Sequence, residues 1–185
     1  FGHVRFVVEA LRSEAVVIRP GENCAGTIHG IRKIDAWLAL HGGGWDVIHF
    51  NFGLHDLKRV KEDGSNSTDP SDGRQSELDE YEVQLRAILA KLLETDATVI
   101  FATTTPVPAG GVRPHRDVDD PARYNDVARA VMRERDVPVN DLNAKVTPFA
   151  AEYLPRVDVH FTRAGSKFLG DRVTEVVREA LAARN

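Results

Sequence analysis

Cysteine is almost absent from this chain of 185 residues, in which Cys24 is the only one. A single thiol excludes an intrachain disulfide and a cluster of thiolate metal ligands. The seven histidines are dispersed and show no HExxH spacing, so we expect no metal site. Composition leaves the cellular compartment open, because cytoplasmic proteins and disulfide-free exported proteins share it.

Long apolar runs and basic clusters are absent as well. No stretch is long and apolar enough to span a bilayer, and the first dozen residues are amphipathic and include Glu9, unlike a signal peptide. Lys and Arg are scattered, and the net charge is −4. We therefore expect neither a nucleic acid nor a membrane as a partner. The missing GxGxxG and GxxxxGKS/T motifs disfavour nicotinamide and P-loop nucleotide chemistry.

The sequence does contain apolar, β-branched segments that alternate with helical patterns. The segments typical of strands buried on both faces are 15–20, 45–53, 97–108 and 137–142. The segments with helical spacing of apolar residues are 4–12, 28–41, 76–95, 121–135 and 163–183, the last with Thr162 placed to cap it. This alternation favours one α/β domain over residues 1–185, with a parallel sheet.

Two features depart from an ordinary α/β pattern. An open α/β sheet usually begins with a strand, yet the first segment here, 4–12, is helical. The polar stretch 61–76 is expected to be a loop that follows a strand end, where α/β folds place their sites. Such a loop is either functional or merely mobile, and both interpretations stay open.

The stretch RVDVHFT near the C-terminus holds the first candidate site. His160 stands in a loop before a helix, and histidine suits a general base because small shifts move its pKa across neutrality. Asp158 is a nearby carboxylate that can fix the tautomer of the ring. Taken alone, the tripeptide is better explained as a solvated Asp beside a His that packs or caps.

The segment FNFGLHDLK, which ends an expected strand, holds the second candidate. Gly53 permits a tight turn, and Asn51, His55 and Asp56 then present polar side chains at the carboxyl end of the strand. A hydrogen-bond donor at this position can stabilise an oxyanion. A structural explanation, in which His55 and Asp56 tie down the turn, fits equally well.

Small residues mark two further turns. The segment ENCAGTIHG (22–30) leads into a helix and exposes backbone N–H groups at its N-terminus, where an anion can bind. The segment TTTPVPAGG (103–111) carries hydroxyls and glycines that can line a pocket. For each segment alone, a plain structural turn is the better explanation.

Taken together and in this order, the blocks resemble the SGNH, or GDSL-like, hydrolase family. HFNFGLHDLK is similar to the third block of that family, and YNDVARAVMRERDVPVNDL and VHFTRAGSKFLGDRV are similar to its closing half. The likeness covers nearly the whole chain from Phe1 onward. Each motif has modest specificity, whereas their order and spacing together favour the family.

The resemblance implies a flavodoxin-like, three-layer α/β sandwich and cleavage of carboxylic esters with short acyl or acetyl groups, on small molecules or carbohydrates. The implied mechanism is acyl transfer to a serine with histidine as base, without a metal or an organic cofactor. The implied catalytic residues are His160 and Asp158, and those implied for the oxyanion and substrate are His55, Gly26, Ala25, Asn51 and Asp56.

The chain departs from the family pattern at three points. The family's nucleophile lies in a GDS turn after the first strand, and no such turn is present; residues 1–12 resemble the helix that follows it, so this strand and its serine are expected upstream of Phe1. The orienting acid usually stands three residues before the histidine, at Val157 here, so that Asp158 is one residue closer. His55 replaces the usual Asn, and a neutral imidazole N–H can donate in its place.

Two alternatives stay open beside the esterase. A non-catalytic binding domain with this fold would keep the pocket and lack the serine. A phosphate- or nucleotide-binding flavodoxin-like protein would carry its phosphate loop after the first strand. An upstream strand that ends in Gly-Asp-Ser would favour the enzyme.

Overall fold

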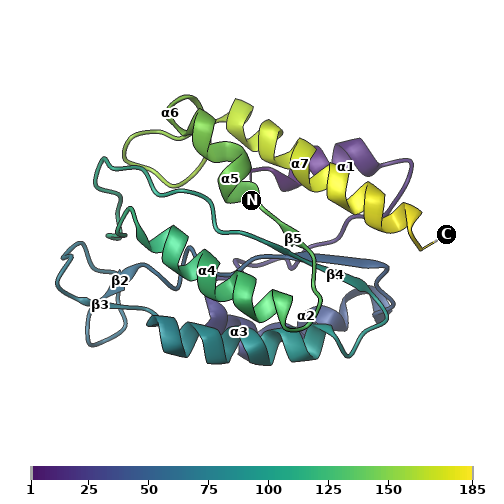
Figure 1. Cartoon of the computed structure of the whole chain (residues 1–185), viewed down its shortest axis with the longest axis horizontal. Coiled ribbons are helices and arrows are strands. Elements are labelled where there is room, and N and C mark those ends of the chain that lie inside the picture. The colour runs from purple at the N-terminus through teal and green to yellow at the C-terminus, as the bar shows by residue number, and fades with distance from the viewer. Residues whose placement is uncertain (1, 185) are drawn as a thin grey trace.

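Three parallel strands form the central sheet of the computed structural model, which describes residues 2–184. Their order across the sheet is β1 (Val47–Phe50), β4 (Thr98–Ala102) and β5 (Val139–Asn140). Ile48 lies opposite Val99, and Phe101 lies opposite Val139. The sheet stands between two layers of helices, which confirms the predicted α/β sandwich (Figure 1).

One face of the sheet is covered by α2 (Thr27–Leu38), α3 (Leu78–Leu92) and α4 (Asp120–Arg133) (Figure 1). In α3, Tyr81, Leu85, Ile88 and Leu92 recur every three or four residues and are at most 2% exposed. They pack with Phe101 of β4 in the larger of two hydrophobic clusters. Burial of each such side chain stabilises the fold by roughly 2 kcal/mol, so this periodic stripe holds α3 against the sheet.

The other face is covered by α1 (Val4–Leu11), α5 (Leu142–Val146), α6 (Ala150–Tyr153) and α7 (Arg163–Ala182), so that helices from both ends of the chain lie side by side (Figure 1). Val7 of α1 packs with Leu169 and Val173 of α7 and with Ala102 of β4 in the second cluster. Neighbouring residues of a strand point to opposite faces, and for this reason Phe101 and Ala102 join different clusters. The remaining helical turns are η1 (Leu40–Gly42) and η2 (Thr147–Phe149).

Helices are present in all five segments where they were predicted. Thr162 caps α7 as expected, because its hydroxyl accepts the N–H of Gly165 at 3.2 Å. α3 begins with a capping box. The side chain of Glu77 accepts the backbone N–H of Glu80, and the side chain of Glu80 accepts the backbone N–H of Glu77. In the part of the chain described here, none of the helices combines the length and apolar character needed to cross a membrane.

The predicted strand at residues 15–20 is wrong, because these residues have no regular secondary structure. A parallel strand needs a neighbour that pairs with its backbone N–H and C=O groups. Among residues 2–184, β1 pairs only with β4, and its other edge has no partner strand. The β-branched composition of residues 15–20 is therefore present without the neighbour that would make it a strand.

A mainly apolar cavity of about 690 Å³, here termed the β1 slot, is lined both by residues 18–20 and by β1. Val47 and Phe50 are among the β1 residues of its wall. Gly2 and His3, which directly precede α1, line the slot as well. The unpaired edge of the sheet thus faces this cavity.

Most of the polar stretch 61–76 is a loop, as predicted, and this loop connects the two strands of a β-hairpin. β2 (Arg59–Val60) and β3 (Gly73–Arg74) pair antiparallel. The Arg59 N–H donates to the His115 carbonyl at 2.9 Å, and the His115 N–H donates to the Ser67 carbonyl at 2.8 Å. The hairpin is therefore joined by backbone hydrogen bonds to the segment before α4.

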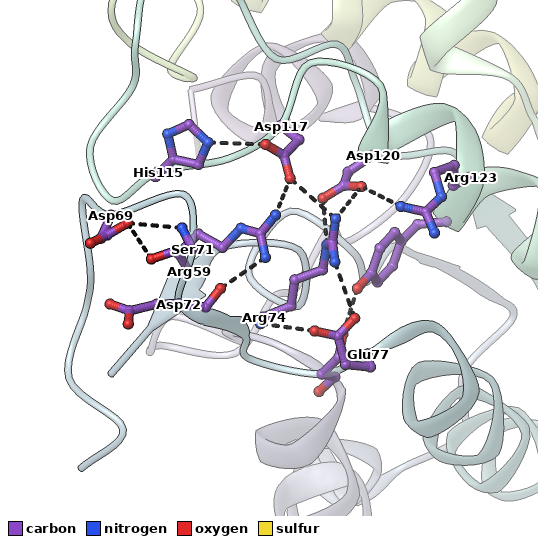
Figure 2. A network of polar contacts seen from close by, with 12 residues as sticks. Arg59, Asp69, Ser71, Asp72, Arg74, Glu77, His115, Asp117, Asp120 and Arg123 are labelled. Atoms are coloured by element: carbon purple, nitrogen blue, oxygen red, sulfur yellow. Dashed lines mark hydrogen bonds and ion pairs between the residues drawn. The ribbon is translucent and has the colours of Figure 1, made fainter. Parts of the chain in front are cut away.

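Figure 2 shows the ion-pair network that joins the hairpin to α4 and to the segment around His115. Nε and Nη2 of Arg74 donate to the two carboxylate oxygens of Asp120, at 2.6 and 3.0 Å. Asp117 accepts from Arg59 and Arg74, and its other oxygen lies 3.0 Å from the His115 ring. Asp120 is 1% exposed, so its charge is stabilised by the Arg74 guanidinium rather than by water.

We expect Asp120→Asn to lower the free energy of unfolding by about 3 kcal/mol, because it leaves the Arg74 guanidinium without its main counter-charge. Asp126→Asn, on the same helix, is the matched control. The Asp126 side chain is 78% exposed and pairs with Arg129, so its loss should be within about 0.5 kcal/mol. Urea denaturation measures both, and equal losses would contradict a stabilising role of the network.

Candidate active site

The predicted pair Asp158 and His160 is in direct contact. Oδ1 of Asp158 accepts the backbone N–H of His160 at 2.9 Å and lies 2.6 Å from Nδ1 of its ring. The carboxylate reaches both groups because the loop turns within these three residues. These bonds, the backbone one first, hold the pKa of Asp158 below its usual value, so the carboxylate is ionised at neutral pH.

The contact with Asp158 fixes the ring of His160. With the Nδ1–H donated to the carboxylate, Nε2 is the nitrogen that can accept a proton. The His160 side chain is 82% exposed, and no serine hydroxyl within residues 2–184 hydrogen-bonds to it. The imidazole of His160 is therefore both oriented and accessible.

His55 lies beside His160, and both line a second cavity of about 220 Å³. Burial, together with the positive charges of Lys58 and Arg116, lowers the pKa of His55 to about 4. The imidazole is therefore neutral at neutral pH and keeps one N–H donor. This is the protonation state that a donor to an oxyanion requires when it replaces an amide.

The turn that places His55 is fixed at the carboxyl end of β1. The Phe52 carbonyl accepts the hydroxyl of Tyr81 at 2.9 Å and that of Thr104 at 3.3 Å. Gly53 follows with φ 148°, and a Cβ at this position would lie 2.1 Å from Oγ1 of Thr104. Glycine alone fits here, so the chain can turn directly after the strand.

Asn51 holds the end of the sheet together. Its Nδ2 donates to the Ala102 carbonyl at 2.7 Å and to the Thr104 hydroxyl at 3.2 Å, which joins the carboxyl ends of β1 and β4. Asn51 also lines the β1 slot. Its amide donors are thus engaged by the protein itself.

Asp56 is enclosed by the protein instead of facing a cavity. It is 0% exposed, and its Oδ1 accepts the N–H and the hydroxyl of Thr27 at 2.7 and 2.5 Å. Its Oδ2 has no hydrogen-bond partner in the described part of the chain. Burial raises the pKa of Asp56 to about 6, although the bonds from Thr27 favour the charged form. Asp56 therefore ties the turn after β1 to the first turn of α2.

The two candidate backbone donors, Ala25 and Gly26, differ in their surroundings. The Ala25 N–H donates to Oδ1 of Asn23 at 2.9 Å, and Ala25 has φ 49°. Gly26 precedes α2, and a Cβ there would lie 2.7 Å from Oδ1 of Asp56. Its N–H makes no hydrogen bond to any of residues 2–184. The N–H of Gly26 is thus without an acceptor among these residues, whereas Ala25 is the one of the two that lines the β1 slot.

The two cavities meet at the candidate site. The residues that line both of them are Asn23, Leu54, His55, Val159 and His160. His55 and His160 consequently stand where the β1 slot joins the smaller cavity. A base and a neutral donor at such a junction can act on one carbonyl group lying between the cavities.

Arg113 and Arg116, which line the smaller cavity, were missed by sequence reasoning. They belong to the stretch RPHRD, which has no periodic pattern and lies far from His55 and His160 in the chain. The available signal was position alone: the stretch follows β4 at the carboxyl edge of the sheet, where α/β proteins gather their sites.

The sequence matches a model of the family described as "GDSL-like Lipase/Acylhydrolase family" over residues 5–168. Among curated proteins no sequence matches. The family match includes every candidate site residue named above.

The fold is similar to several solved structures. The lipase/acylhydrolase from Enterococcus faecalis has a TM-score of 0.75 and 21% identity, over 95% of this chain and 84% of that chain. The acetyl xylan esterase AlAXEase has a TM-score of 0.75 and 17% identity, over 95% and 90%. Axe2, an acetylxylan esterase from Geobacillus stearothermophilus, has a TM-score of 0.72 and 18% identity, over 95% and 80%. At these identities the likeness shows a shared three-layer fold.

We expect Gly53→Ala to lower the free energy of unfolding by about 2–4 kcal/mol, because the new Cβ meets Thr104 at a φ that L-residues avoid. Gly64→Ala is the matched control: Gly64 also has a positive φ, of 79°, but nothing lies within 4 Å of the added Cβ. Its cost should be about 1 kcal/mol. Thermal unfolding compares the two, and a Gly53→Ala protein as stable as Gly64→Ala would contradict the steric constraint.

The raised pKa of Asp56 predicts a pH dependence of stability. Between pH 3.8 and about 6 the folded chain keeps a proton that the unfolded chain has released, so this stability is present below pH 3.8 and is lost as pH rises through about 6. We expect the unfolding free energy of wild type, relative to Asp56→Asn, to fall by roughly 2 kcal/mol between pH 4 and pH 7.

Urea denaturation across this range measures the difference. Burial lowers the pKa of His3, His49 and His55 to about 4, which gives the opposite slope, but these groups are present in both proteins and cancel. Asp96→Asn, at an exposed carboxylate, should run parallel to wild type. Parallel profiles for Asp56→Asn and wild type would refute the prediction.

Proposed function

The chain belongs to the GDSL-like lipase/acylhydrolase family, whose reaction is ester hydrolysis, and we propose that this protein cleaves short-acyl carboxylic esters through a serine acyl-enzyme. The observation that carries the proposal is the oriented pair of Asp158 and His160 at the junction of two cavities. An ionised carboxylate on Nδ1 leaves Nε2 as the base that acyl transfer needs.

The proposed reaction has two half-reactions. A serine hydroxyl attacks the acyl carbonyl while Nε2 of His160 takes its proton, and the tetrahedral oxyanion accepts N–H bonds from His55 and Gly26. Collapse breaks the ester C–O bond, and His160 returns the proton to the leaving alcohol. Water then attacks the acyl-enzyme in the same way, which releases the carboxylic acid and the serine. None of these steps uses a metal or an organic cofactor.

Asp56 has a positioning role in this proposal. Its bonds to Thr27 hold the start of α2, and with it Gly26, against the turn that carries His55. The two proposed oxyanion donors are therefore kept at a fixed separation. Loss of one such donor typically costs on the order of a hundred- to a thousandfold in rate.

We propose that the nucleophilic serine precedes Phe1, on a strand that occupies the β1 slot. Support comes from the unpaired edge of β1, from the mainly apolar wall of the slot, and from Gly2, which lines the slot directly before α1. A strand that enters α1 and returns through residues 15–20 makes a right-handed parallel crossover. Residues 15–20 would then gain the neighbour they need to become a strand, and the end of the new strand would face His160.

The proposed substrates are short-acyl esters, acetyl esters among them, of small alcohols or carbohydrates. Two proteins with a similar fold are named as acetyl xylan esterases. The low identity means that these names support a class of ester and not a particular alcohol.

A non-catalytic binding domain is the second candidate. It is favoured by the observation that no serine of residues 2–184 forms a hydrogen bond with His160. A fluorophosphonate probe separates the two candidates when applied to protein that includes the polypeptide before Phe1. An esterase is labelled on a serine there, whereas a binding domain is not labelled.

We expect His160→Ala, in protein that includes the upstream serine, to reduce kcat for 4-nitrophenyl acetate by roughly a thousandfold or more, since the base of acyl transfer is lost. Release of 4-nitrophenol measures this. His41→Asn, at an exposed histidine with a positive φ, serves as the control and should keep full activity. Near wild-type turnover by His160→Ala would rule out the assignment of the base.

A further inference from the structure

The smaller cavity beside His160 has an unusual distribution of charge. Lys58, Arg113 and Arg116 line it, and Asp158 is the only acidic residue among the described residues of its wall. The wall thus carries three positive charges and one negative charge. The negative charge is already engaged by the His160 ring and backbone.

Arg116 is the central cation of this cavity. It is 7% exposed, its Nε donates to the Leu54 carbonyl at 2.8 Å, and its Nη1 donates to the Pro114 carbonyl at 3.2 Å. No carboxylate of residues 2–184 forms an ion pair with it. Burial lowers the pKa of Arg116 to about 10, which leaves it charged at neutral pH. The charge of Asp158 acts in the opposite direction, but the hydrogen bonds of the guanidinium go to neutral carbonyls, so a bound counter-charge would stabilise it further.

Lys58 and Arg113 are unpaired as well. Neither side chain forms a hydrogen bond or an ion pair with the described residues, and Lys58 is half-buried. Burial and the nearby charge of Arg116 lower the pKa of Lys58, and the enclosed Asp56 only partly offsets this. Two cations are thus held close enough to repel each other, and a bound anion would relieve that repulsion.

The cavity is built by the elements that the ion-pair network holds. Lys58 precedes β2, and Arg113 and Arg116 flank His115, whose backbone pairs with Arg59 and Ser67. The cationic wall is therefore held in place before any ligand binds. Side chains that are already held in place lose little conformational entropy when a ligand binds.

We propose that this cavity binds a negatively charged group of the ester substrate, with Arg116 and Lys58 as its specificity-determining residues. The inference rests on the proposed ester hydrolysis and names its substrate class: esters that carry a carboxylate, or a similar anion, next to the scissile bond. Arg116 offers a planar fork of N–H donors for two oxygens, and Lys58 adds a point charge. His55 and His160 line the same cavity, so the bound anion lies close to the reacting carbonyl.

Two matched pairs of esters test the requirement for charge and show which side of the ester carries it. Mono(4-nitrophenyl) succinate has a carboxylate on the acyl side, and 4-nitrophenyl 4-methylpentanoate has a similar shape without charge. 4-Acetoxybenzoate has a carboxylate on the alcohol side of the ester, and methyl 4-acetoxybenzoate is its neutral partner. In protein with the upstream serine, we expect one anionic ester to exceed its neutral partner in kcat/KM by about tenfold or more.

Substitutions assign that preference to the two cations. Lys58→Met and Arg116→Gln should each bring the ratio of anionic to neutral kcat/KM close to one, and Arg116→Lys should keep part of it. Because the ratio is internal to each protein, a general loss of activity does not change it. Arg135→Gln, an exposed cation outside the cavity, is the control and should leave the ratio unchanged.

The outcomes separate this inference from the proposed function. Ratios near one for both ester pairs in wild type, or ratios that both Lys58→Met and Arg116→Gln leave unchanged, would overturn the inference while esterase activity stands. If no ester is cleaved, the proposed function fails, and calorimetry with monomethyl succinate and dimethyl succinate decides on the cavity. The inference is supported if monomethyl succinate binds, dimethyl succinate does not, and Lys58→Met weakens the binding of monomethyl succinate. It is overturned if the two compounds bind equally or if neither binds.

Discussion

The carboxyl end of β1 is the constraint on which the candidate site depends. The hydroxyls of Tyr81 and Thr104 hold the Phe52 carbonyl, and Gly53 makes a turn that no side chain permits. This turn sends His55 to the junction of the cavities and Asp56 into the interior, where it bonds Thr27, 29 residues away in the sequence. One hydrogen-bonded joint thus sets both proposed oxyanion donors, because Gly26 adjoins Thr27.

Helices were predictable from the sequence because their signal is local. In α3 the apolar stripe and the capping box lie within one segment, and the structure has the helix there. Residues 15–20 show the limit of such reasoning, because a strand exists only when another strand accepts its hydrogen bonds. Segments of similar composition therefore form the three strands β1, β4 and β5, each of which has a neighbour. Residues 15–20 form no strand, because they have none.

In the candidate site, likewise, contacts between residues near in sequence were predictable, and contacts between distant segments were not. The contact between Asp158 and His160 spans two residues, and the sequence order sufficed to suggest it. The surroundings of Asp56 were not readable, since the same polar residue faces solvent or Thr27 depending on how two distant turns meet. Arg116 was invisible for a similar reason, because its place in the cavity depends on the hairpin that pairs with its neighbour His115.

The ion-pair network of Figure 2 joins the hairpin, the segment around His115 and α4, and none of its labelled residues belongs to the loop that carries His160. Arg59 and Arg74 hold the cationic wall through Asp117 and Asp120, whereas His160 sits in the loop before α7 at the other end of the chain. Under the proposed function, a change in the hairpin can therefore alter which ester binds without displacing His160. On that proposal, substrate choice is the exchangeable part of this architecture, separate from the acyl-transfer chemistry.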